Sequence, residues 1–182
     1  MKSLEQHLII KTMKKYIIAI LVLIFLASCN HQKSENKAEA DYHEKCRRLV
    51  LSENKIGQDY SFKISGKIID EISITYLGET KTKQDKVLRF LNSTNFTGLY
   101  EDARRANSSI YIYDGTGHKL GSYYVGSLNS LPNKIEDGRL IFLYSNETCN
   151  QTTSISFTDS IPRQIFVSCT KNGGNLYTFQ TK

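Results

Sequence analysis

The chain has 182 residues, with 24 Lys and Arg against 18 Asp and Glu, so its formal net charge at pH 7 is +6. The basic residues are spread along the sequence, and its globular part holds two basic pairs, Arg47–Arg48 and Arg104–Arg105. Nucleic-acid-binding domains gather Lys and Arg into a stripe on one element. The charge pattern therefore argues against nucleic acid as a partner.

The first 28 residues have the pattern of an export signal. Lys14–Lys15 precede the apolar run Ile17–Leu26, and the small residues Ala27–Ser28 follow it. A basic start, an apolar run and small residues are the three parts of a secretory signal. The run is too short to cross a bilayer, which needs about 20 apolar residues. We expect a signal peptide over residues 1–28, with Met13 as its natural start.

The junction Leu26–Cys29, which reads Leu-Ala-Ser-Cys, resembles the signal of bacterial lipoproteins. The resemblance implies cleavage before Cys29, which then carries acyl chains on its thiol and on its new amino group. Each buried methylene contributes about 0.8 kcal/mol, so several chains on one residue give stable anchoring. We therefore expect a lipid-anchored protein of the bacterial envelope, held at the outer membrane on its periplasmic or surface face.

Removal of residues 1–28 leaves 154 residues with 20 basic and 17 acidic side chains, a net charge of +3. This length predicts one domain. Residues 29–39 are polar and predict a lipidated, flexible tether. The remaining residues, 40–182, are expected to form a single β-rich globular domain.

Two helices are predicted in this domain. The first, a short N-terminal helix at Ala40–Leu51, has apolar residues at i, i+4 and i+7 from Tyr42. The second, Thr82–Leu91, has an apolar stripe that begins at Val87, and the Thr82 hydroxyl can cap its amino end. This second helix is expected to pack on the strands.

Strand patterns fill most of the remaining sequence. A hairpin is predicted around the loop Ile69–Glu71, with Ile64 opposite Tyr76, because both flanking segments alternate polar and apolar residues. Residues 92–107 look irregular, and Leu140–Tyr144 lacks alternation, which favours a strand covered on both faces. Further strands are expected at Ser109–Tyr113, Lys119–Val125, Thr153–Thr158, Arg163–Cys169 and Leu176–Gln180.

These elements predict an α+β fold, in which about seven or eight strands form an antiparallel β-meander with the helix Thr82–Leu91 packed on it. Parallel strands would need helical crossovers, and the second half of the chain has none in its pattern. A small half-closed β-barrel is the alternative.

A disulfide between Cys149 and Cys169 is predicted. A three-residue loop at residues 158–160 sets the two cysteines opposite each other in a hairpin, whereas a two-residue loop turns them to opposite faces. Two buried thiols are the alternative. Cys46 is then expected in the core. His43 and Cys46 could together supply two zinc ligands, whereas a structural zinc site needs four. We predict no metal site.

Catalytic residues are sparse. His43 and His118 are the histidines available after the tether, and His118 falls in a Gly-rich turn. Acid–base catalysis needs two carboxylates facing each other across a cleft, whereas the acidic pairs of this chain are neighbours in sequence at predicted loops. We expect no enzymatic activity and no cofactor. The pairs are Asp70–Glu71, Glu101–Asp102 and Glu136–Asp137.

Aromatic residues offer the one candidate binding surface. Exposed Tyr rings suit protein interfaces and sugar contacts, because they bury area at low entropy cost and keep a polar tip. Tyr is also an ordinary strand former, so half-buried sheet positions are the alternative. The candidate residues surround one hairpin and are Tyr111, Tyr113, Tyr123, Tyr124 and His118.

Three classes of function follow. The first is a non-enzymatic lipoprotein that binds another protein, as an assembly accessory, an inhibitor or an immunity-type protein. The second is a lipoprotein that binds a small ligand or a glycan through the Tyr-lined hairpin. The third is an enzyme whose site the sequence does not reveal. The first is our leading hypothesis.

Overall fold

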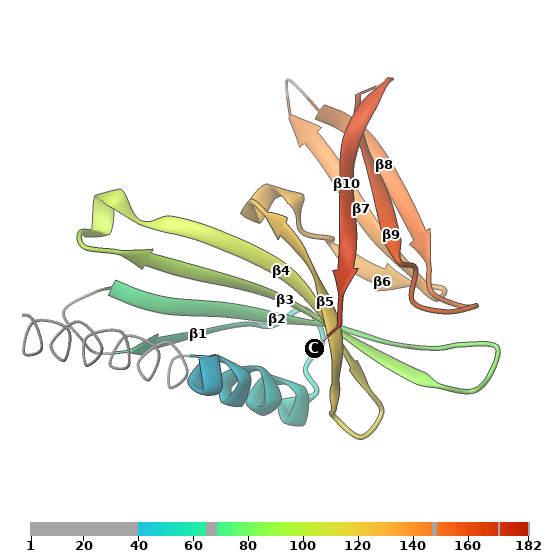
Figure 1. Ribbon diagram of the computed structural model, residues 1–182, viewed down its shortest axis with the longest axis horizontal. Helices are drawn as coiled ribbons and strands as arrows, with labels where there is room; N and C mark the ends of the chain where they lie inside the picture. Colours follow the sequence, from blue (N-terminus) through green and yellow to red (C-terminus); the bar gives the residue numbers. More distant parts are fainter. Residues whose placement is uncertain (1–39, 65–68, 147–148, 171, 182) are drawn as a thin grey trace, which may run out of the picture. The chain divides into compact units, whose positions relative to one another are not determined.

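The computed structural model describes residues 40–64, 69–146, 149–170 and 172–181 (Figure 1). The predicted signal peptide, the acylation site Cys29 and the tether lie outside the described residues. The chain divides into two units, Met1–Glu44 and Lys45–Lys182, and all the strands given below belong to the second. No helix among the described residues combines the length and the apolar character needed to cross a membrane.

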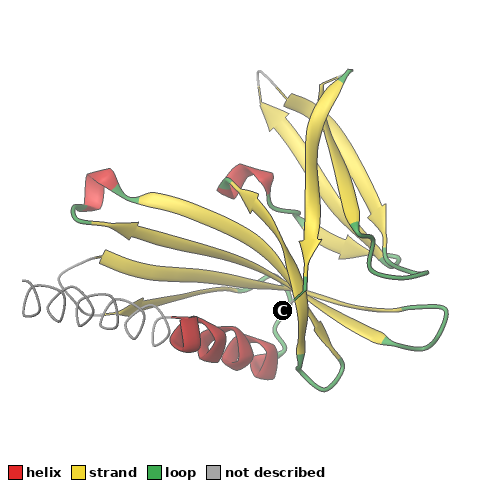
Figure 2. Cartoon of the chain, viewed as in Figure 1, coloured by secondary structure: helices red, strands yellow, loops and turns green. Residues whose placement is uncertain are grey.

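A helix over residues 40–53 confirms the predicted N-terminal helix. Strands and two short 3-10 helices make up the rest of the described chain (Figure 2). The strands are β1 (Asp59–Ile64), β2 (Ile69–Lys81), β3 (Val87–Gly98), β4 (Arg105–Asp114), β5 (Lys119–Gly126), β6 (Lys134–Glu136), β7 (Arg139–Asn146), β8 (Cys149–Ser156), β9 (Gln164–Thr170) and β10 (Gly173–Gln180). The 3-10 helices are η1 (Glu101–Ala103) and η2 (Leu128–Ser130).

Antiparallel pairing organises these strands into two sheets. The larger sheet has the order β1-β2-β3-β4-β5-β10-β9, and the smaller has the order β6-β7-β8. Within the described residues no ladder joins β8 to β9, so the sheets do not close into a barrel. The structure therefore confirms the predicted α+β class, with antiparallel sheets that follow the chain as a meander over β1 to β5.

The main core joins side chains of the two sheets. The rings of Phe90 on β3 and Phe157 after β8 meet edge to face, with centroids 4.9 Å apart, a geometry that aromatic pairs prefer. Burial of this apolar surface supplies the main driving force for folding. The fully buried members of the cluster are Phe90, Ile110, Ile112, Tyr123, Leu140, Phe142, Phe157 and Val167.

The helix covers the opposite face of the larger sheet, through its residues 45–53. The strand ladders align Tyr76, Leu91 and Tyr111 on that face, and the guanidinium of Arg47 lies 4.1 Å from the centre of the Tyr111 ring. The helical side chains Cys46, Val50 and Leu51 are buried. The central strands of this sheet are consequently buried on both faces.

Arg89 of β3 ties the end of the helix to the sheet. Its Nη2 donates to the carbonyl of Leu51 (2.7 Å) and to Oδ1 of Asn54 (3.2 Å), and its Nε donates to the Tyr76 hydroxyl (3.4 Å). The last carbonyls of a helix lack partners within the helix and carry partial negative charge, so a cation that donates to them is stabilising.

The predicted helix at Thr82–Leu91 is wrong. Residues 82–86 form the turn between β2 and β3, and Val87 begins a twelve-residue strand. Asp85 has a φ of +58°, which a right-handed helix does not allow. The Thr82 hydroxyl does accept hydrogen bonds from backbone amides, as predicted for a cap, but these amides belong to the turn. They are the amides of Gln84 (3.3 Å) and Lys86 (3.2 Å).

Three strand predictions also need correction. Ile64 pairs with Asp70 instead of Tyr76, and residues 65–68 between the two strands lie outside the described residues. Residues 92–107 are mostly strand, because β3 continues to Gly98 and β4 begins at Arg105, and only residues 99–104 between them lie outside the sheet. The strand at Leu140–Tyr144 is not covered on both faces, because Leu143 is 47% exposed.

We expect replacement of Arg89 by Met to destabilise the second unit. The substitution leaves the partly buried carbonyl of Leu51 and the hydroxyl of Tyr76 without their donor, which costs about 2–3 kcal/mol. Urea unfolding followed by circular dichroism measures this change. Arg105→Met is the matched control at an exposed position, and an equal loss in both variants would contradict the role assigned to Arg89.

Candidate binding surfaces

The Tyr-lined hairpin is built by β4 and β5, but it does not present its tyrosines together. Tyr113 and Tyr123 are fully buried, on opposite faces of the sheet. The Tyr123 hydroxyl donates to the carbonyl of Pro162, and burial raises the pKa of this phenol. These two residues are core residues, so their assignment to a binding surface was wrong.

The other two tyrosines differ in environment. Tyr111 is half-buried, with Arg47 4.1 Å and Lys119 5.3 Å from its ring centroid, so cation–π contacts already occupy the ring. Tyr124 is 52% exposed, and its hydroxyl donates to Oδ1 of Asn107 (3.0 Å). Only Tyr124 among the four offers a large open face, and one ring does not make a binding surface.

His118 lies in the turn between β4 and β5, beside Asp114 and Thr116. Oδ1 of Asp114 accepts from the Thr116 amide (2.9 Å), the Thr116 hydroxyl (2.6 Å) and the His118 amide (2.9 Å). His118 Nδ1 is 2.7 Å from the Thr116 hydroxyl and 3.6 Å from Asp114 Oδ2. A catalytic triad places nucleophile and acid at different ring nitrogens, whereas here both lie at Nδ1. The hydrogen bonds among Asp114, Thr116 and His118 stabilise the turn and do not form a catalytic triad.

The acidic pairs lie on separate elements, with Glu101–Asp102 in η1 and Glu136–Asp137 at the end of β6. Asp70–Glu71 lies in β2 and not in a loop, and Glu71 accepts from Ser61 (2.6 Å) and from Arg104 (2.9 Å). The Ser61 hydrogen bond is the main reason that the pKa of Glu71 is lowered. Among the described residues, no three His, Cys, Asp or Glu side chains gather as a metal site.

Cys149 of β8 and Cys169 of β9 form a disulfide, which confirms the predicted pairing. Their Cα atoms are 4.7 Å apart. The predicted hairpin ladder is not the reason, since the two strands are edges of different sheets. At the same seam the Ser168 amide donates to Oγ1 of Thr153 (3.0 Å). The disulfide therefore links the two sheets. Cys46 is buried, as expected, and outside this bond.

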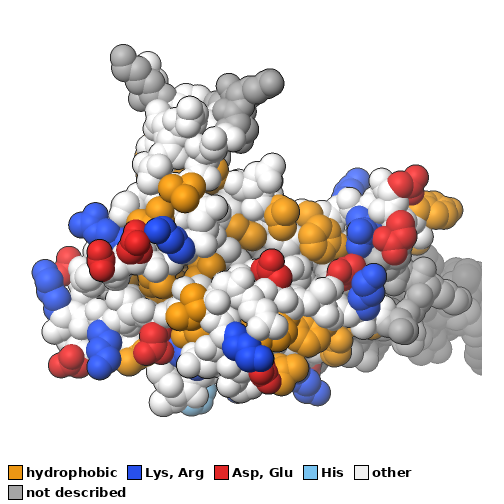
Figure 3. Space-filling model, turned by 180° about the vertical axis from the view of Figure 1, so that it is seen from behind, with side chains coloured by type: hydrophobic (Ala, Val, Ile, Leu, Met, Phe, Trp, Pro, Cys, Tyr) orange, Lys and Arg blue, Asp and Glu red, His pale blue; other side chains and the backbone are white. Residues whose placement is uncertain are grey.

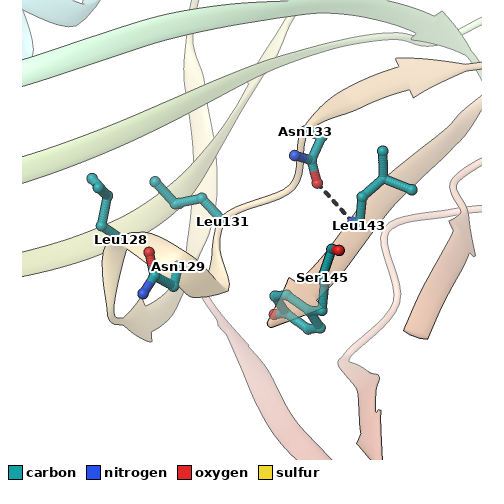
Figure 4. A pocket seen from close by; sticks show the side chains of 7 residues that line it. Leu128, Asn129, Leu131, Asn133, Leu143 and Ser145 are labelled. Carbon is teal, nitrogen blue, oxygen red and sulfur yellow. Dashed lines mark hydrogen bonds between the residues drawn. The ribbon is translucent and has the colours of Figure 1, made fainter. Parts of the chain in front are cut away.

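A hollow of about 380 Å³ lies where η2 and the loop after it approach the end of β7 (Figure 4). Leu128 and Leu143 keep 49% and 47% of their surface exposed beside it. Burial raises the pKa of Tyr144, which also lines the hollow, to about 12. The other lining residues are Asn129, Leu131, Asn133 and Ser145.

Hydrogen bonds fix the walls of this hollow. The Ser127 hydroxyl accepts from the Asn129 amide (3.3 Å) and caps η2. Asn92 of β3 donates to the carbonyl of Pro132 (2.8 Å), and Oδ1 of Asn133 accepts from the Leu143 amide (2.7 Å). The hollow is thus held by the strands on both sides of the loop and is preformed.

The sequence did not indicate this hollow, because it forms where β6 ends short of β7, and strand lengths were not predicted at that precision. One signal was available. Leu128 and Leu131 fall in a segment of polar and turn-forming residues, and two leucines in such a loop need either a core contact or a partner. Figure 3, which views the molecule from behind relative to Figure 1, shows hydrophobic side chains at the surface in several separate groups among charged ones.

No family model, curated protein or solved structure matches this chain. The functional argument therefore depends on the residues themselves.

We expect removal of the disulfide, by the double change Cys149→Ala and Cys169→Ala, to lower the free energy of unfolding. Closing a loop with a sequence separation of 20 contributes on the order of 3 kcal/mol. Thermal unfolding measures the change. Reduction should destabilise the native chain similarly and leave the double variant unchanged; an equal effect on both would contradict the prediction.

We expect the turn at Asp114 to loosen only in acid below the usual titration range of Asp. The pKa of Asp114 is lowered, chiefly by the Thr116 hydroxyl and then by the amides of His118 and Thr116. The turn contacts are therefore present above the ordinary Asp pKa and lost as pH falls through the lowered one. The NMR shifts of the Thr116 and His118 amides report this titration.

Thr116→Val removes the largest of these contributions and should raise the midpoint of that titration. Asp114→Asn should abolish it. An unchanged midpoint in Thr116→Val would contradict the assignment of the hydroxyl as the main cause.

Proposed function

We propose that this chain is a lipid-anchored bacterial envelope protein whose β-rich body binds another protein and catalyses no reaction. The junction Leu26–Cys29 supports the anchor, because it combines small residues with a cysteine directly after an apolar run. Acyl chains on Cys29 would hold the protein at the outer membrane, on the periplasmic or surface face.

The observation that carries the binding role is the preformed hollow beside η2, with Leu128 and Leu143 half exposed at its rim. Protein interfaces are built around an apolar centre with a polar surround, and the asparagines and Ser145 supply such a surround here. A rigid site also loses little conformational entropy on binding.

A glycan-binding role has less support. Sugar sites present exposed aromatic faces, but the tyrosines of the β4–β5 hairpin are mostly buried or already stacked with cations. A catalytic role for His118 would need a water-excluding site, whereas its side chain is 76% exposed. A protein partner therefore remains the best-supported class, in the role of an assembly accessory, an inhibitor or an immunity-type protein.

The test uses the full chain in bacterial cells, with Cys29→Ser as the variant. We expect the native protein to be cleaved before Cys29 and to carry acyl chains detectable by mass spectrometry, and the variant to carry none and to lose cleavage at that position. Ser28→Thr is too close to the junction to serve as a control, so Ser34→Ala within the tether is the matched change.

The binding role is tested by photo-crosslinking from position 128 in the anchored protein. One defined adduct is expected, and it should be reproduced by mixing the purified partner with the purified chain. Membrane localisation without any adduct at position 128 would contradict the binding role while leaving the anchor intact.

A further inference from the structure

One edge of β7 is only partly paired. The ladder between β6 and β7 covers Arg139, Leu140 and Ile141, whereas β7 continues to Asn146. On the other edge, β8 pairs with the whole of β7. Among the described strands, no ladder partner follows β6 along the first edge beyond Ile141.

Asn133 shows which backbone groups point to that edge. Its amide donates to the carbonyl of Ile141 (2.8 Å), and its Oδ1 accepts from the amide of Leu143 (2.7 Å). The backbone of every second residue in a strand points to the same edge. The carbonyl of Leu143 and both the amide and the carbonyl of Ser145 therefore face the side on which β6 has ended.

The hollow lies along this open edge. Leu143 and Ser145 line it from β7, while Leu128, Asn129 and Leu131 line it from η2 and the following loop (Figure 4). A strand edge supplies backbone hydrogen bonds to an extended chain, and an adjacent hollow selects a side chain of that chain. Three leucines line this hollow beside asparagine, serine and tyrosine side chains. The lining includes no Asp, Glu, Lys, Arg or His, so a charged side chain placed there would lose its hydration without gaining an ionic partner, and this cost favours an uncharged segment.

We propose that the partner inserts an extended, uncharged peptide segment that pairs with β7 at Leu143–Ser145 and places an apolar side chain in the hollow beside Leu128 and Leu131. This inference rests on the proposed protein-binding function and specifies its surface. The segment adds a strand to the smaller sheet along the β7 edge that β6 leaves open. At the start of this edge, Oδ1 of Asn133 accepts from the Leu143 amide in place of a backbone carbonyl.

A phage-displayed library of random dodecapeptides, selected on the acylated full chain in detergent, tests this proposal. We expect peptides that share one large apolar residue within an uncharged stretch. Deuterium exchange should show protection of the Ser145 amide when such a peptide is bound. A library that yields no binding peptide would overturn the proposal.

Ser145→Pro is the decisive variant, because proline removes the one amide that faces the open edge and is tolerated where a strand amide points to solvent. Leu143→Asp is the second, because it places a charge at the rim of the hollow. Each should weaken the selected peptides about tenfold or more. Leu176→Asp, at an apolar position that is 59% exposed on β10, is the matched control and should bind normally.

Circular dichroism and thermal unfolding establish that the variants fold. If Ser145→Pro fails to fold, Leu143→Asp together with the exchange measurement still decides the question. Selected peptides that bind both variants as tightly as the native chain would overturn the proposal.

Two further outcomes separate this inference from the proposed function. A protein partner that crosslinks at position 128 but binds Ser145→Pro and Leu143→Asp normally supports the function and overturns the strand pairing. A concentration-dependent dimer, seen in sedimentation of the native chain and lost in Ser145→Pro, would show that the edge pairs with a second copy of this chain. That result would overturn the proposal that the edge binds a segment of a different protein.

Discussion

The structure depends on the burial of β2, β3 and β4 on both faces of the larger sheet. One face meets the smaller sheet, and the other meets the helix. Each central strand therefore carries apolar side chains in both directions, as at Phe90 and Leu91, which are adjacent and both fully buried. An antiparallel sheet with one wet face would alternate instead. The helix and the smaller sheet are thus both required to keep this sheet dry.

This constraint explains why the pattern at Thr82–Leu91 predicts a helix, whereas the structure has a turn followed by strand β3. Apolar residues on both faces of a strand remove the period-2 signal, and the remaining spacing of Val87, Leu88 and Leu91 fits a helix. In the structure Leu88 and Phe90 enter the main core, while Leu91 faces the helix side. Periodicity fails where a sheet has no exposed face, and neighbouring elements decide the outcome.

Elements with one buried face were easier to predict. The helix at residues 40–53 and strand β5, in which buried and more exposed residues alternate, both appear where the pattern placed them. The disulfide was also correct, although its cysteines lie on the edges of two sheets and not within one ladder. The chain reverses direction between β8 and β9, and this reversal brings Cys149 and Cys169 together although the two strands do not form the predicted hydrogen-bonded ladder.

The candidate site could not be predicted in the same way, because exposure depends on what lies above each strand. Tyr113 and Tyr124 look equivalent in sequence, yet the first is fully buried and the second is half exposed. The hollow beside β7 arises from a difference in length, since β6 has three residues and β7 has eight. Such a mismatch in strand length exposes backbone groups but requires no particular residue type, so the sequence carries no signal of it. The side chain of Asn133 satisfies only the first of them, the Leu143 amide, and the edge beyond it is the one on which the proposed strand pairing depends.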